Sequence, residues 1–67
     1  MTRPTPAEFI AARKAAGHTQ ADVARLVYAG LRTVNRWESG EILMPPAEWA
    51  LYRLRTGQTT IEQLEPA

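Results

Sequence analysis

Residues 19–40 read TQADVARLVYAGLRTVNRWESG, and this stretch decides the fold that the sequence predicts. It contains two helical patterns, residues 20–28 and 31–39, with the small residues 29–30 between them. Thr19 is a favourable N-cap for the first pattern, and a glycine follows the second, where helices commonly end. Because helices of two to three turns are not stable alone, both must pack against neighbours. We interpret the stretch as a helix-turn-helix pair held inside a larger helical domain.

The helix predicted at residues 31–39 has two different faces on a helical wheel. Its apolar face carries Thr33, Val34 and Trp37. The opposite face is basic and polar and carries Arg32, Asn35 and Arg36, with Leu31 at the border. A solvated surface helix usually mixes acidic residues with its basic ones, and this face has none. We expect the apolar face to pack on the core and the basic face to bind a partner.

A third helix is predicted before this pair. Residues 6–16 begin with a capping box that Thr5 and Glu8 form, and they end at a glycine. The inward stripe of this helix consists of Phe9, Ile10, Ala12 and Ala16. Arg13 and Lys14 are expected on its outer side.

Two more helices are predicted after the pair. Residues 46–55 follow a proline pair that stops any earlier helix. A cap at Thr59 opens a short final helix, which is expected to fold Ile61 and Leu64 back onto the core. Five helices and no strand pattern predict a single, compact, all-α domain of 67 residues.

The wheel of residues 46–55 divides its large side chains in an unusual way. Its small and aliphatic residues share the expected core side, namely Ala47, Ala50, Leu51 and Leu54. Trp49 and Tyr52 point the other way, and two exposed aromatic residues on a small domain need a cover. Either the last helix or the N-terminal arm covers them, or they form a homodimer contact, with residues 46–64 as dimerisation helices.

The composition excludes several classes of protein. The chain has no cysteine, so neither a disulfide nor a thiolate-bound zinc can stabilise its small core. No apolar run approaches the roughly 20 residues of a membrane span, and the N-terminus lacks the apolar core of a secretory signal. We therefore expect a cytoplasmic protein, in a bacterium or a phage-infected cell. Its fold is expected to be stabilised by tight helix packing or by oligomerisation.

The residues that enzymes use are scarce. The chain has a single histidine (His18), a single serine (Ser39) and a single aspartate (Asp22). His18 precedes a helix cap, where a solvated or capping role is expected. The sequence has no glycine-rich phosphate loop, and its His, Asp and Glu residues do not have metal-ligand spacing. We expect no enzyme activity, no cofactor, no metal and no small-molecule ligand.

Charge is divided unevenly along the chain, although its total is only +1. Residues 1–36 carry six basic and two acidic side chains, a net charge of +4. Residues 37–67 carry two basic and five acidic side chains, a net charge of −3. One half can therefore face a polyanion while the other faces solvent or a partner, unless the scatter of surface charge is random.

The basic face of residues 31–39 has side chains suited to reading DNA. A guanidinium group can pair with two acceptors of guanine, and an asparagine amide can serve adenine similarly. Arg32, Asn35 and Arg36 are therefore candidate base-reading residues. The candidates for contacts with DNA phosphates are Gln20, Thr33 and Lys14. The predicted partner is double-stranded DNA.

The same stretch resembles the helix-turn-helix of the Cro and phage-repressor family. The matching residues are Thr19-Gln20, Ala24, Thr33-Val34 and Arg36-Trp37-Glu38-Ser39-Gly40, which follow the family's TQ start and its W-E-x-G end. The resemblance covers residues 19–40, a third of the chain, and implies a compact all-helical DNA-binding domain that works as a dimer on a two-fold operator. The residues Met44-Pro45-Pro46 and Trp49-Ala50-Leu51-Tyr52 are similar to the tail of very small phage autorepressors, such as anti-CRISPR-associated regulators.

By position, the resemblance assigns roles to individual residues. The family's groove-reading sites fall on Leu31, Arg32 and Arg36, with Asn35 adjacent. Its phosphate-binding glutamine falls on Gln20, its buried aromatic residue on Trp37 and its structural acid on Glu38. Tyr28 replaces the family's turn glycine, and Gly30 replaces its Ser or Thr cap. Because left-handed geometry costs a non-glycine residue about 1–2 kcal/mol, we expect Gly30 to take that conformation, which would shift the start of the recognition helix by about one position.

These observations predict a sequence-specific DNA-binding regulator, most simply a repressor. It would bind a palindromic operator as a homodimer, with residues 31–39 as the recognition helix in the major groove. One alternative is an antitoxin that binds a toxin through Trp49 and Tyr52 and autoregulates its operon. Another is an interaction module that kept the fold and lost DNA binding, although the acid-free face argues against it. The sequence does not distinguish a repressor from an antitoxin.

Overall fold

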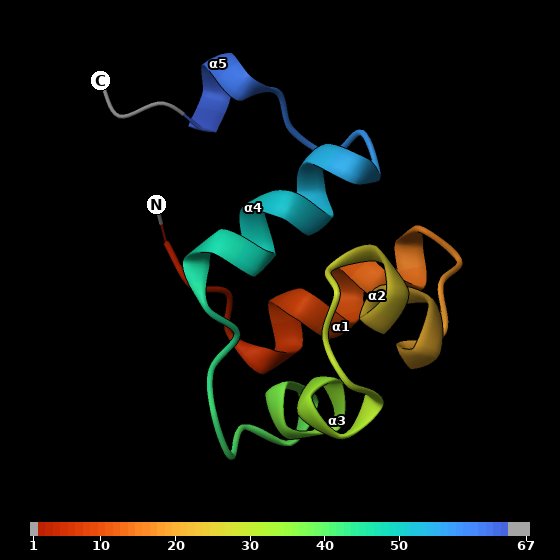
Figure 1. The fold of residues 1–67 in the computed structure, drawn as a ribbon. Coiled ribbons are helices and arrows are strands. Elements are labelled where there is room, and N and C mark those ends of the chain that lie inside the picture. The colour runs from red at the N-terminus through yellow and green to blue at the C-terminus, as the bar shows by residue number, and fades with distance from the viewer. Residues whose placement is uncertain (1, 65–67) are drawn as a thin grey trace.

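The computed structural model describes residues 2–64 and folds them into five helices. In chain order these are α1 (Pro6–Ala15), α2 (Gln20–Leu26), α3 (Leu31–Ser39), α4 (Pro46–Arg55) and α5 (Ile61–Leu64). Figure 1 shows α3 at one end of the molecule and α5 at the other, with α1 and α2 in contact with α3. No strand occurs among the described residues, so the all-α prediction is confirmed.

Two capping boxes fix the starts of α1 and α2. Thr5 Oγ1 accepts from the backbone N–H of Glu8 at 3.1 Å, and Glu8 Oε1 accepts from the backbone N–H of Thr5 at 2.9 Å. Thr19 and Asp22 make the same reciprocal pair at 3.1 and 2.9 Å. The hydrogen bonds from the threonine backbone, followed by those from its side chain, lower the pKa of each capping carboxylate. The predicted starts of both helices are confirmed.

The core is built around Phe9 of α1. Its ring meets Trp37 and Tyr52 edge-on with centroid distances of 6.1 Å, and Trp49 at 6.5 Å. Edge-to-face aromatic pairs each add about 0.5–1.5 kcal/mol beyond the area that they bury. The remaining core side chains are aliphatic or thioether groups, namely Val23, Ala24, Val27, Val34 and Met44. Aromatic residues from α1, α3 and α4 therefore hold these three helices together.

Tyr52 corrects the predicted wheel of α4. The wheel places Tyr52 and Trp49 on the non-core face, whereas Tyr52 is 0% exposed and Trp49 packs partly buried against the core. The physical reason is that α4 is packed on more than one side, because it contacts α2 as well as the rings of Phe9 and His18. The predicted non-core position of Tyr52 is wrong, and a dimer contact through this side chain has no exposed surface to use.

The last helix differs from its prediction in its cap and in its packing. Thr60, and not Thr59, forms the cap, because Thr60 Oγ1 accepts from the backbone N–H of Gln63 at 3.3 Å. Thr59 is buried instead and donates to Gln63 Oε1 at 3.1 Å. Ile61 is 63% exposed and Leu64 is half-buried, and Figure 1 shows α5 on the side of α4 that faces away from α1 and α3. A single turn with two apolar residues buries too little area to be held against the body, so the predicted packing of Ile61 is wrong.

Candidate functional site

The predicted reading face of α3 lies on the surface. Val34 and Trp37 are buried and fix the opposite side of the helix to the core, as predicted. Arg32, Asn35 and Arg36 are exposed, and Leu31 is 49% exposed at the start of the helix. Residues three and four apart are neighbours on a helix surface, so the four predicted base-reading side chains share one exposed flank.

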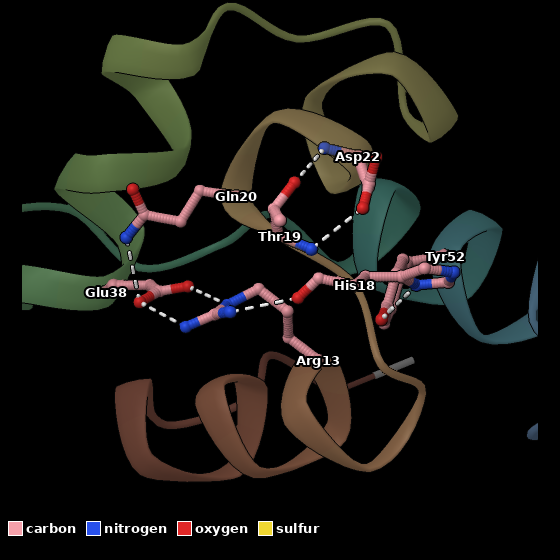
Figure 2. A network of polar contacts seen from close by, with 7 residues as sticks. All are labelled: Arg13, His18, Thr19, Gln20, Asp22, Glu38 and Tyr52. Atoms are coloured by element: carbon pink, nitrogen blue, oxygen red, sulfur yellow. Dashed lines mark hydrogen bonds and ion pairs between the residues drawn. The ribbon is translucent and has the colours of Figure 1, made fainter.

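Glu38, the only acidic residue of α3, turns away from this flank. Its Oε2 accepts from Arg13 Nε at 2.6 Å, and its Oε1 accepts from Gln20 Nε2 at 3.0 Å. The Arg13 and Glu38 side chains are only 15% and 11% exposed. Figure 2 shows the Arg13 side chain reaching from α1 to Glu38 of α3, with Gln20 of α2 on the same carboxylate. Three helices therefore meet at one carboxylate, and α3 presents no acid of its own to solvent.

Arg13 is the structural residue that the helical pattern misplaces. The pattern predicts an outer position for it, but its guanidinium binds Glu38 and also donates through Nη1 to the carbonyl of His18 at 3.0 Å. The long arginine side chain allows this, because its stem can lie along the surface of α1 while its charged head reaches another helix. Its partner lies 25 residues away, which no local spacing could indicate.

One acidic residue lies beside the exposed face of α3, although it belongs to the connector after the helix. Glu41 Oε2 lies 3.1 Å from Arg36 Nε, and both side chains are exposed. The face is therefore acid-free within α3 itself and has one acid at its border. An exposed ion pair is worth about 0–1 kcal/mol, so Arg36 can exchange Glu41 for another anion at little cost.

The three predicted phosphate contacts lie in different surroundings. Lys14 is exposed on α1, and Thr33 is half-buried beside the exposed face of α3. Gln20 is half-buried, and its amide nitrogen donates to Glu38. The structure thus gives Gln20 an internal hydrogen bond that the sequence does not predict, and it leaves Lys14 as the most accessible of the three.

The turn between α2 and α3 overturns one prediction. Tyr28 takes the left-handed conformation, with a φ of 57°, whereas Gly30 is the N-cap of α3 with a φ of −78°. The backbone N–H of Ala29 donates to the carbonyl of Ala24 at 2.9 Å, which closes α2 as a Schellman motif. That motif requires left-handed geometry directly after the C-cap, whichever residue stands there. Because α3 begins at Leu31, the start of the predicted recognition helix is not shifted.

His18 has a structural role. Its Nδ1 lies 3.1 Å from the hydroxyl of Tyr52, and its ring is half-buried. Burial raises the pKa of Tyr52, against the opposing effects of the Arg13 charge and a hydrogen bond with Gln58. The hydroxyl of Tyr52 therefore keeps its proton at neutral pH and is within hydrogen-bond distance of His18 Nδ1. The predicted solvated role is wrong for the His18 ring. The predicted capping role is met by its backbone, whose N–H donates to the carbonyl of Arg13 at 3.1 Å near the end of α1.

Within residues 2–64, no group of three or more His, Cys, Asp or Glu side chains is placed to hold a metal ion. Across the same residues, no helix has the length and apolar character needed to cross a membrane.

Comparison with known proteins does not assign the chain to a family. No protein-family model matches it, and no curated protein is significantly similar to it.

Proposed function

We propose that the protein binds double-stranded DNA in a sequence-specific manner and regulates transcription. The observation that carries the proposal is the exposed face of α3, where Arg32, Asn35 and Arg36 lie together while Glu38 is turned inward. A polyanion is the partner that such a face suits best, because the helix offers it two guanidinium groups and no carboxylate.

Side-chain chemistry favours base reading over general phosphate binding for this face. Arginine can pair bidentately with guanine O6 and N7, and asparagine with adenine N6 and N7. The major groove, about 12 Å wide, admits one α-helix, and a reading helix must be rigid to select bases. Rigidity is supported by the burial of Val34 and Trp37 and by the ion pair between Glu38 and Arg13.

The resemblance of residues 19–40 to the Cro and phage-repressor family supports a repressor that binds a palindromic operator as a homodimer. In such a complex two copies of α3 lie about 34 Å apart, one turn of DNA. Lys14, Thr33 and Gln20 would contact phosphates and set the position of α3 in the groove. A cytoplasmic location, in a bacterium or a phage-infected cell, follows from this function.

The antitoxin alternative needs an exposed face that contains both Trp49 and Tyr52. Tyr52 is buried, so no observation favours that alternative. A homodimer must likewise use other surface than the Tyr52 ring.

A gel-shift assay against the DNA upstream of the protein's own gene tests the proposal. Complexes are compared with random DNA of equal length while salt is raised from about 50 to 200 mM, a range in which non-specific binding falls steeply. We expect a complex with the upstream DNA that survives salt at which the random complex is lost. Equal loss of both complexes, or no complex at all, would contradict the proposal.

A further inference from the structure

Arg55, the last residue of α4, contacts the turn that leads into α3. Its Nη1 donates to the backbone carbonyl of Leu26 at 2.8 Å, and its guanidinium lies 5.3 Å from the centroid of the Tyr28 ring. Leu26 ends α2, where the last carbonyls of a helix have no partner within it. Arg55 therefore holds both the end of α2 and the residue after its cap, and it does so from 29 residues along the chain.

Tyr28 is an unusual residue for its position. Its φ of 57° lies in the left-handed region, where a bulky side chain is strained, and its side chain is 80% exposed. Because the Tyr28 ring is so exposed, it buries little apolar surface that could offset the strain of the left-handed backbone. A guanidinium over an aromatic face and a cation at the C-terminal end of a helix are both favourable contacts. Arg55 supplies the first contact to the Tyr28 ring and the second to the carbonyl of Leu26, two residues earlier.

We propose that Arg55 is a positioning residue for α3, because it stabilises the left-handed conformation of Tyr28 and thereby sets the direction in which α3 leaves α2. Only Ala29 and Gly30 separate Tyr28 from α3, so a change in the Tyr28 backbone redirects the whole helix. The effect on DNA reading rests on the proposed function, whereas the effect on the turn does not. A residue of α4, outside residues 19–40, thus controls the presentation of Arg32 and Arg36.

Arg53 provides a matched control on the same helix. Its guanidinium lies 5.3 Å from the centroid of an aromatic ring too, that of Trp49. Replacing either arginine by alanine removes one positive charge and one contact with an aromatic ring. The contacts that Arg55→Ala removes are those with the Tyr28 ring and the Leu26 carbonyl at the turn, whereas Arg53→Ala removes a contact within α4. A difference between the two variants therefore measures the turn and not the charge.

Hydrogen exchange of the Ala29 amide tests the turn without DNA, because its bond to the Ala24 carbonyl forms only when the turn is closed. Amides of α1 serve as the reference for global opening. Relative to them, we expect Ala29 to exchange about tenfold faster in Arg55→Ala and at the parent rate in Arg53→Ala. Equal Ala29 exchange in the two variants would overturn the proposal. If Arg55→Ala does not fold, Arg55→Lys and Arg53→Lys are compared in the same way, with the same two outcomes.

Rescue by glycine separates positioning from general stability. Glycine takes a positive φ without strain, so Tyr28→Gly should restore the slow exchange of Ala29 in the Arg55→Ala background. On DNA that the parent binds specifically, Arg55→Ala should bind about tenfold more weakly than Arg53→Ala, and the double variant should recover that loss. Failure of the double variant to recover either property would overturn the proposal.

The two proposals fail in different ways. If the parent binds no DNA specifically, the proposed function and the DNA part of this inference both fall, and exchange of Ala29 still decides the role of Arg55 in the turn. If the parent binds DNA and Arg55→Ala binds as tightly as Arg53→Ala, only the inference is overturned.

Discussion

Helices α3 and α4 have similar lengths but are packed against the rest of the protein in different ways. α3 buries Val34 and Trp37 on one side and leaves its basic side to solvent. α4 buries Ala50 and Tyr52 and keeps most of its other residues half-buried. A helix that packs on one side retains a face that can evolve for binding, whereas a helix that is packed on several sides becomes scaffold. In this protein α3 is the former kind and α4 the latter.

Substitutions at Tyr52 of α4 and Arg36 of α3 should differ most in their effect on the free energy of unfolding. Tyr52→Ala removes a fully buried ring from α4 and should lower the free energy of unfolding by about 3–5 kcal/mol. Arg36→Ala removes an exposed side chain from α3 and should change it by no more than about 0.5 kcal/mol. Urea denaturation of the two variants measures both values. Similar losses in the two variants would show that α4 is not packed as described.

Loss of the ion pair between Arg13 and Glu38 should have the next largest effect on the free energy of unfolding. Arg13→Ala leaves the half-buried Glu38 carboxylate with only the Gln20 amide, and we expect a loss of about 2–4 kcal/mol in unfolding free energy. Arg25→Ala is the control, because the ion pair of Arg25 with Asp22 is exposed and should be worth less than about 1 kcal/mol. If both variants are equally stable, the ion pair does not hold α3 to α1.

Alkaline pH gives a smaller and more specific test of the burial in α4. Since burial raises the pKa of Tyr52 above its ordinary value of 10.0, the unfolded chain ionises first. The stabilisation is fully present below pH 10.0 and is lost as pH rises through the higher folded pKa. Stability of the parent should therefore fall more steeply above that pH than stability of Tyr52→Phe, which lacks the ionisable hydroxyl. Identical pH profiles would mean that this hydroxyl is not desolvated by folding.

Local features of the fold could be read from the sequence, and long-range ones could not. The caps at Thr5 and Thr19 follow from residues three positions apart, and the apolar side of α3 follows from its own periodicity. Tyr52 could not be placed, because a helical wheel assumes that one side of a helix is buried. Its burial depends on Phe9, more than 40 residues earlier in the chain.

The candidate site divides in the same way. The exposure of Arg32, Asn35 and Arg36 follows from the helical period, so sequence alone predicts the face. The Glu38 side chain points inward because it pairs with Arg13. The left-handed conformation of Tyr28 is accompanied by a contact from Arg55. Both contacts join segments that are distant in the chain, and no spacing within residues 19–40 reveals them.

The affinity of arginine variants for specifically bound DNA tests the central claim most directly. Arg32→Ala and Arg36→Ala should each lose about 1–3 kcal/mol of binding free energy and relax base preference at one position per half-site, while keeping parental stability. Arg25→Ala, which removes an exposed positive charge from α2, should lose much less on the same DNA and keep the base preference. Unchanged affinity and base preference in both α3 variants, or an equal loss in Arg25→Ala, would contradict the account that the exposed face of α3 reads DNA.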